Sequence, residues 1–346
     1  MNPQIAQMGR RVLDADSLGP AEALFLAGLE GDDLYDLFYW ANRVRLKHFG
    51  RRVTFCSIAA AKVGACSEDC KFCAQSARFA THAATLSRLS DEQLVQAAAE
   101  ASANGAESFG IVNSGRGPND RELDALAGPV ARIVADGGAR PCASLGVLTF
   151  EQARRLVAIG VRRYNHNLET SRRHFPNIVT THRYDDRLAT LRVARDAGLS
   201  LCCGGIFNLG EDWADRIDLA MTLRQVDPDV VPLNFLNPIP GTPLADTPSM
   251  PPMTILQIVA IYRLLLPAKP IKLAGGRDVN LRDLQSWAFY CGASSVMIGN
   301  YLTTFGRPVE ADHQMIRDLG LAATPAAPLD EGRAGPTSKA PISPSA

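Results

Sequence analysis

The sequence predicts an α/β fold, a TIM-type (β/α)8 barrel with an N-terminal helical extension and a disordered C-terminal tail. Three observations lead to this prediction. From residue 53 onward, short apolar runs alternate with longer stretches of helical periodicity, the pattern of parallel strands joined by crossover helices. Eight such runs can be counted, the number that closes a TIM barrel. The chain of 346 residues also exceeds the roughly 250 residues of such a barrel, which leaves room for extensions at both ends.

Residues 1–50 are predicted to form the helical extension. Amphipathic helices are expected at residues 21–29 and 32–49, where apolar positions such as Leu34, Leu37 and Ala41 recur at helical spacing. We expect these helices to cover one end of the barrel.

The barrel is expected over residues 51–321. Its predicted strands span residues 53–58, 108–112, 140–145, 162–167, 200–206, 230–236, 271–274 and 295–298. Its predicted helices lie near residues 90–104, 119–136, 149–159, 184–197, 212–226, 253–266 and 280–290. Two of these helices begin with a capping-box pattern, Ser90 with Gln93 and Thr149 with Gln152, which favours the assignment.

Residues 322–346 form the predicted tail. This segment is rich in Pro, Ala, Ser and Gly and has almost no large apolar residues, so it cannot bury enough surface to offset the entropy of ordering. We therefore expect it to be disordered.

Composition narrows the class of partner and the compartment. Lys and Arg total 36 against 36 Asp and Glu, so the net charge gives no reason to expect nucleic acid or an anionic membrane. No run approaches the ~18 apolar residues of a membrane span, and the first residues lack the pattern of a secretory signal. The sequence predicts a cytoplasmic protein with a small-molecule partner, whose eight cysteines are metal ligands or buried thiols rather than disulfides.

Three cysteines, Cys66, Cys70 and Cys73, follow the first predicted strand with the spacing C-x3-C-x2-C. Soft thiolate ligands select iron-sulfur clusters or zinc. Closed structural zinc sites normally use four ligands, and neither a second C-x2-C knuckle nor an H-x3-H follows in this chain. Three thiolates would leave one iron of a 4Fe-4S cluster open to an exogenous molecule. A structural metal knuckle and a chance cluster of cysteines are the plain alternatives.

Other chemically capable side chains lie on the predicted strands. TIM-barrel active sites lie at the C-terminal ends of the strands, where the cysteine loop is also expected. Each of these residues alone has a simpler explanation, because a buried cysteine is more often a small core residue. Their joint placement indicates a site; they are Cys142, Cys202, Cys203, Asn234, Lys272 and the segment Asn165-His166-Asn167-Leu168-Glu169.

Around the cysteines the chain resembles the radical S-adenosylmethionine (SAM) superfamily, whose signature combines this spacing with a nearby aromatic residue, here Phe72. The segment from Lys62 to Ser76 is similar to the narrower biotin synthase family. Other segments look like that family, occur in its order and extend the resemblance over roughly residues 35–320. They are residues 164–170, 179–181, 195–198, 203–206, 231–236, 240–245 and 274–277.

This resemblance implies a TIM-type barrel, usually a homodimer, that converts dethiobiotin to biotin by inserting sulfur between two unactivated carbons. It implies that Cys66, Cys70 and Cys73 hold a 4Fe-4S cluster whose open iron binds SAM. An electron from the cluster, replenished by a reductant such as flavodoxin or ferredoxin, then cleaves SAM to a 5′-deoxyadenosyl radical. The cofactor carries out the difficult chemical step, and the protein orients the cofactor and excludes water.

The resemblance also implies roles for individual residues outside the cysteine loop. Asn167 and Glu169 match positions that contact the SAM ribose, with Asn167 also near the substrate. Arg187 matches an arginine that meets the SAM carboxylate, a natural use of a guanidinium fork, although an exposed helix arginine is the plain alternative. Asn234 matches a residue that hydrogen-bonds the ureido ring of dethiobiotin. A side-chain amide suits this role, because it offers both a donor and an acceptor to such a ring. Asn208 stands where the family pattern predicts Gly.

The family pattern breaks at a second cluster. Biotin synthases of the familiar kind hold a 2Fe-2S cluster, viewed as the source of the inserted sulfur, on cysteines of strands two, three and five and an arginine of strand seven. Cys142 and Cys202 match two of these ligands, but Gly110 and Lys272 occupy the other positions. Glycine supplies no ligand, and a protonated lysine supplies no lone pair.

Cys56 can replace one of the missing ligands. Side chains alternate along the first strand, so Cys56 can point into the barrel if its neighbour Phe55 points outward. Our hypothesis is that Cys56, Cys142 and Cys202 hold a rearranged auxiliary cluster, 2Fe-2S or of another nuclearity. If Cys202 points into the barrel, its neighbour Cys203 points outward and serves packing, and Cys291 is structural.

Two other functions stay open at this level. If the auxiliary cluster is lost, the protein is a biotin-synthase-like radical SAM enzyme that acts on another small substrate without inserting sulfur; Gly110 and Lys272 favour this alternative. A non-catalytic iron-sulfur or zinc protein is the third possibility. Four residues count against it, because a cavity for SAM and a substrate requires them and a simple redox sensor does not: Asn167, Glu169, Arg187 and Asn234.

Overall fold

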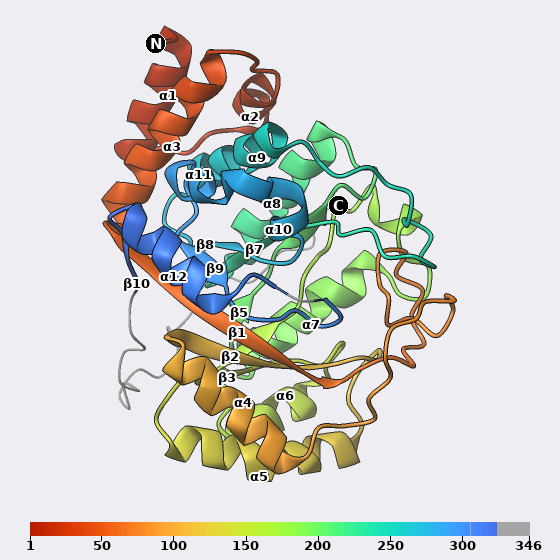
Figure 1. Cartoon of the computed structure of the whole chain (residues 1–346). Helices are drawn as coiled ribbons and strands as arrows, with labels where there is room; N and C mark the ends of the chain where they lie inside the picture. Colours follow the sequence, from red (N-terminus) through yellow and green to blue (C-terminus); the bar gives the residue numbers. More distant parts are fainter. Residues whose placement is uncertain (305, 324–346) are drawn as a thin grey trace.

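The computed structural model describes residues 1–304 and 306–323, and its centre is a curved parallel sheet with helices outside it (Figure 1). The eight predicted apolar runs all form strands, and the fifth run forms two. The strands are β1 Arg52–Lys62, β2 Ala106–Asn113, β3 Arg140–Ser144, β4 Arg163–Asn165, β5 Ser200–Cys202, β6 Gly205–Phe207, β7 Val231–Phe235, β8 Ile271–Leu273 and β9 Ser295–Met297. The TIM-type α/β prediction is confirmed.

The strands follow one another around a barrel. Their order runs β5-β4-β3-β2-β1-β9-β8-β7-β6, and every neighbouring pair is parallel. Isolated parallel bridges, Glu169 to Gly205 and Cys202 to Val230, link the two ends of this path. The fifth run is divided at Gly204, where a Cβ would lie 1.8 Å from the carbonyl oxygen of Pro232. Only glycine permits so close a backbone approach.

Three helices precede the barrel, α1 Pro3–Leu13, α2 Pro20–Ala27 and α3 Asp33–Phe49. The second and third match the predicted pair, whereas α1 was not predicted. Its signals were nevertheless present, because Asn2 caps the helix by accepting from the backbone N–H of Gln4 (3.0 Å), and a proline follows at the first helical position. These helices stack near α9 and α11, at the end of the barrel where β1 begins (Figure 1).

The outer helices follow the predicted alternation. They are α4 Asp91–Ala103, α5 Asp120–Ala135, α6 Phe150–Ala158, α7 Tyr184–Asp196, α8 Trp213–Val226 and α9 Pro252–Leu265. The last predicted helix is broken into α10 Arg277–Leu281, the 3-10 turn η2 Arg282–Leu284 and α11 Gln285–Tyr290, and a 3-10 turn η1 Phe175–Asn177 precedes α7. Both predicted capping boxes are present, at the starts of α4 and α6.

The chain after the barrel adds two elements that were not predicted, α12 Val309–Asp318 and β10 Ala322–Ala323. The tail predicted to be disordered from residue 322 therefore begins with a short strand, because Ala322 and Ala323 pair in parallel with Arg52 and Val53 of β1. Residues 324–346 of that prediction lie outside the described residues. Across the part of the chain that the structure describes, no helix has the length and apolar character needed to cross a membrane.

Candidate active site

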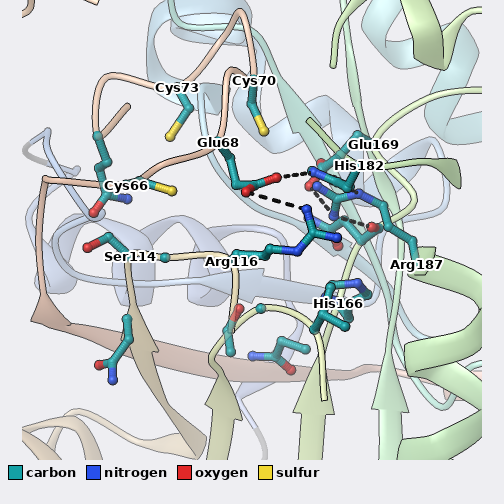
Figure 2. Close-up of a pocket in the computed structure, with 18 of the residues that line it drawn as sticks. Cys66, Glu68, Cys70, Cys73, Ser114, Arg116, His166, Glu169, His182 and Arg187 are labelled. Atoms are coloured by element: carbon teal, nitrogen blue, oxygen red, sulfur yellow. Dashed lines mark hydrogen bonds and ion pairs between the residues drawn. The ribbon is translucent and has the colours of Figure 1, made fainter. Parts of the chain in front are cut away.

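The loop that follows β1 brings the three cysteines of the motif together. The backbone N–H of Cys66 donates to Gln75 (3.0 Å), and the N–H of Ala77 donates back to Cys66 (2.8 Å), so the loop closes on itself. A further bond from the N–H of Cys73 to Cys70 (2.9 Å) tightens the turn between them. Figure 2 shows the three sulfur atoms pointing into one shared space. The loop therefore presents three thiols to a single ligand.

The chemistry of these thiols fits an iron-sulfur cluster. Within residues 1–304 and 306–323, no three His, Cys, Asp or Glu side chains are arranged to hold a single metal ion. A cluster has a different requirement, since each thiolate binds its own iron. Burial raises the pKa of the Cys70 thiol to about 12 and also raises the pKa of the Cys73 thiol, so a metal that binds these two sulfurs displaces their protons.

Arg187 lies beside this space on α7, and its guanidinium is held by three neighbours. Its Nη1 donates to the carbonyl oxygen of Asn167 (2.8 Å) and to Oε1 of Glu169 (3.1 Å), while its Nε donates to Nε2 of His182 (3.1 Å). The residue is buried, and its guanidinium also packs over the ring of Phe175. The alternative of an ordinary exposed helix arginine is therefore wrong.

Glu169 combines an unusual backbone conformation with a buried carboxyl group. Its φ of +70° lies in the left-handed region, which is rare for residues other than glycine and common at functional sites. Burial raises the pKa of its carboxyl, and its Oε2 is buried without a hydrogen-bond partner among the described residues. Such an orphaned acceptor suits a ligand hydroxyl, as in the ribose of SAM. Asn167 lines the same cavity, and its Oδ1 accepts from the N–H of Gly204 (3.2 Å).

The cavity continues from the cysteine loop into the barrel. Its outer part is lined by the three cysteines and Arg187, and its inner part by Asn234, Cys202 and Lys272. The two parts share seven lining residues, which are Phe72, Cys73, Gln75, Ser144, Asn165, Asn167 and Glu169. The end of the inner part that carries Cys202 and Lys272 is called the barrel floor. A molecule in the inner part would therefore lie between the cysteine loop and this floor.

Asn234 lies on β7 in the inner part of the cavity. Its Nδ2 donates to the carbonyl oxygen of Gly205 (3.0 Å), and its Oδ1 accepts from the N–H of Gly275 (2.9 Å). These bonds hold the amide plane in place between two strands. One N–H and one oxygen lone pair are left for a ligand, since an amide has two of each.

Three thiols and an ammonium meet on the barrel floor. The Nζ of Lys272 lies 3.3 Å from Sγ of Cys56 and 3.5 Å from Sγ of Cys202. Cys142 lies near this group: burial raises the pKa of its thiol, and the charges that act on it are those of Arg163, Cys202, Lys272 and Cys56. Cys56 packs with inner-barrel residues, as its predicted inward orientation requires. Cys203 and Cys291 are instead fully buried in the main core.

The familiar 2Fe-2S ligand set does not fit this floor. Gly110 provides no ligand, and a Cβ added there would lie 3.0 Å from a methyl carbon of Ile58, a tight approach. Lys272 presents an ammonium in place of the arginine. The donors that do face the floor are the thiols of Cys56, Cys142 and Cys202, a soft set that suits iron and sulfide.

Sequence reasoning missed several residues of the outer cavity. Glu68, inside the cysteine motif, lies 2.5 Å from Nδ1 of His182 and accepts from the hydroxyl of Thr181 (2.7 Å). Arg116 closes this side of the cavity by donating to the carbonyl oxygen of Thr181 (2.7 Å). The sequence marked residues 179–181 and the cysteine motif, but nothing in it indicated that the two segments touch. Asn208, expected to be Gly, has a φ of +78°, which asparagine tolerates better than most residues.

Comparison with known proteins gives consistent matches over most of the chain. The Radical SAM superfamily model matches residues 62–223, and the Biotin and Thiamin Synthesis associated domain model matches residues 232–322. The biotin synthase of Geotalea daltonii is 49% identical, over 93% of this chain and 98% of that protein. The biotin synthase of Heliobacterium modesticaldum is 50% identical, over 90% of this chain and 94% of that protein.

Two solved structures share the fold. Methylornithine synthase (PylB) has a TM-score of 0.81 at 19% identity, over 92% of this chain and 97% of that chain. The FeFe-hydrogenase maturase HydG from Carboxydothermus hydrogenoformans has a TM-score of 0.76 at 19% identity, over 92% and 78%. At this identity the likeness concerns the fold alone.

Proposed function

The chain belongs to the biotin synthase family of radical SAM enzymes, and from this premise we propose how its residues carry out the reaction. It inserts sulfur into dethiobiotin to form biotin. When bound, the 4Fe-4S cluster and SAM supply the radical that removes hydrogen from unactivated carbons. The protein's own residues bind, orient and enclose the reactants. The alternatives without sulfur insertion or without catalysis gain no support from these relatives.

We propose that Cys66, Cys70 and Cys73 hold the 4Fe-4S cluster and that Arg187, Glu169 and Asn167 hold SAM beside it. The convergence of the three sulfurs supports the first assignment. The buried guanidinium of Arg187 and the orphaned Oε2 of Glu169 support the second, because they suit a carboxylate and a hydroxyl of one ligand.

We propose that dethiobiotin occupies the inner cavity, bound by Asn234 and near Asn167. The observation that carries this assignment is the continuity of the cavity, whose outer and inner parts share lining residues. A substrate held there would lie between the SAM site and the floor thiols, where both hydrogen removal and carbon–sulfur bond formation can reach it.

An Asn234→Ala variant tests the substrate assignment. Loss of hydrogen bonds to the ureido ring costs roughly 1 to 3 kcal/mol, which raises the KM for dethiobiotin by about 5- to 150-fold. Affinity for SAM should change little, because Asn234 does not line the outer cavity.

Asn237→Ala is the matched control, since Asn237 lines the same cavity and makes no side-chain hydrogen bond within the described residues. Steady-state kinetics with a melting curve for each variant separate binding from folding. An unchanged KM in Asn234→Ala would place the substrate elsewhere.

We propose that Cys56, Cys142 and Cys202 hold the auxiliary cluster in place of the familiar ligand set. All three thiols are buried, and Lys272 supplies a positive charge that offsets thiolate charge. The nuclearity of such a cluster, 2Fe-2S or a variant, follows from an iron count.

We also propose a reduced flavodoxin or ferredoxin as the electron donor. Lys71 is exposed on the cysteine loop between Cys70 and Cys73, where an acidic protein could dock. A Lys71→Glu variant should slow SAM cleavage driven by reduced flavodoxin by about tenfold at low salt, through lost electrostatic steering, and less at high salt.

The matched control is Arg43→Glu, the same charge change on α3 at the far end of the barrel. With dithionite as reductant, Lys71→Glu and the unmodified protein should cleave SAM at the same rate. Equal slowing with dithionite would mean that the substitution damages the cluster loop rather than a docking surface.

Two features support the expected homodimer and cytoplasmic location, which we propose in turn. Tyr35 of α3 and Trp287 of α11 lie edge to face on the surface, and Tyr290 extends this exposed aromatic group. Exposed apolar groups of this kind suit a protein contact, and this supports the proposed homodimer.

The state of the cysteines supports the proposed cytoplasmic location. All eight cysteines are free thiols, which suits a reducing compartment.

A further inference from the structure

Glu68 reaches from the cluster loop to the helix that carries Arg187. It stands between Cys66 and Cys70 in the sequence, yet its carboxylate lies 2.5 Å from Nδ1 of His182, which is 114 residues away. Both side chains are buried. Figure 2 shows Glu68, His182 and Arg187 in a row along one side of the space into which the sulfurs point. Glu68 and His182 line the outer cavity but are not among the residues proposed to hold the cluster, SAM or dethiobiotin.

The partners of His182 select one tautomer of its ring. A neutral imidazole has one N–H donor and one acceptor nitrogen. The Glu68 carboxylate can only accept, so the proton belongs on Nδ1 of His182. Its Nε2 then carries the lone pair and accepts from Nε of Arg187 (3.1 Å). Burial, together with the charge of Arg187, lowers the pKa of His182, which keeps the ring neutral and Nε2 free to accept.

The same chain of contacts determines which part of Arg187 faces a ligand. Its Nε is bound by His182, and its Nη1 is bound by the carbonyl of Asn167 and the carboxylate of Glu169. The Nη2 group makes no hydrogen bond to any residue that the structure describes, and Arg187 lines the outer cavity. The guanidinium is thus fixed on two edges, and its Nη2 is the group left for an incoming carboxylate.

We infer that Glu68 and His182 are positioning residues for SAM binding: Glu68 fixes the tautomer of His182, and His182 in turn fixes Arg187 with its Nη2 toward the SAM carboxylate. This inference rests on the proposed role of Arg187. The link also ties the loop that holds the cluster to the group that holds its ligand, because Glu68 is part of that loop.

The tautomer can be measured directly on the unmodified full-length protein. Only six histidines are present, so histidine-selective 15N labelling gives a short set of ring signals, and a His182→Asn variant assigns the one that matters. The expected state is Nδ1–H with a bare Nε2. A bare Nδ1 with Nε2–H, or a doubly protonated ring, overturns the inference without any variant having to fold well.

SAM affinity tests the consequence, measured by equilibrium dialysis on the reconstituted protein without reductant or dethiobiotin. His182→Asn lacks an acceptor at the Nε2 position and should bind SAM about tenfold more weakly, whereas the longer amide of His182→Gln should restore most of that loss. Glu68→Ala should show a similar loss, and the Glu68→Ala/His182→Asn double variant should be no worse than either single variant. Unchanged affinity in His182→Asn, or additive losses in the double variant, overturns the inference.

Two controls separate this inference from its premise. His174→Asn alters a histidine eight residues earlier that bonds Leu209 (3.1 Å) and does not touch Arg187, so SAM affinity should stay within about twofold. An equal loss there would indicate general damage and overturn the inference. Arg187→Ala tests the premise: if it leaves SAM affinity unchanged, the proposed function of Arg187 fails, whereas a loss in Arg187→Ala without one in His182→Asn refutes the positioning role alone.

Discussion

A Cys70→Ala variant is expected to lose SAM cleavage and biotin formation together, down to the background of each assay. Only two thiols of the loop would remain, and no neighbouring cysteine is placed to substitute, since those of the floor are at the other end of the cavity. No protein side chain replaces the chemistry of the cluster. Chromatography of 5′-deoxyadenosine and mass detection of biotin measure the two losses, and the iron and sulfide content after anaerobic reconstitution shows whether the cluster is held.

Cys291→Ala is the control for the loss of a buried thiol. Cys291 is fully buried, and burial alone raises the pKa of its thiol, with no electrostatic influence from either group of cysteines. Its removal should lower stability by roughly 1 kcal/mol and leave the iron content unchanged. A Cys70→Ala protein that kept a full cluster and cleaved SAM would show that the loop does not hold the cluster.

Cys56→Ala is expected to separate the two halves of the reaction. It removes a thiol of the floor and none of the loop, so SAM cleavage should continue while biotin formation is lost. The unmodified protein should contain more than four irons per chain, and the variant about four, the content of one 4Fe-4S cluster.

Cys203→Ala is the matched control, since Cys203 directly follows Cys202 in the segment between β5 and β6. Its thiol lies in the main core rather than on the floor, and both the iron content and biotin formation should survive its loss. About four irons in the unmodified protein and in Cys56→Ala alike would refute an auxiliary cluster on these thiols.

Much of the fold could be predicted because its signals are local. Strands buried on both faces read as continuous apolar runs, and the capping boxes at Ser90 and Thr149 mark helix starts. The division of the fifth strand could not be predicted, because it depends on the approach of Gly204 to Pro232, a tertiary contact. Helix α1 could have been found from the cap at Asn2.

The candidate site divides in the same way. Cys66, Cys70 and Cys73 could be named because their spacing lies within one loop. The pairing of Glu68 with His182 joins segments 114 residues apart, and no periodicity or spacing encodes such a contact. The contact between Lys272 and Cys56, 216 residues apart, likewise emerges only when the barrel closes. The resemblance placed Lys272 and the thiols of Cys56 and Cys202 at the same cluster, but it did not indicate that the ammonium contacts both sulfurs directly.

The most direct test is to incubate the reconstituted full-length protein with dethiobiotin, SAM and reductant and to detect the products by mass spectrometry. If the three thiols of the loop hold the 4Fe-4S cluster and the three thiols of the floor hold the auxiliary cluster, the products should be biotin, 5′-deoxyadenosine and methionine. The appearance of 5′-deoxyadenosine and methionine without biotin would contradict sulfur insertion by this chain.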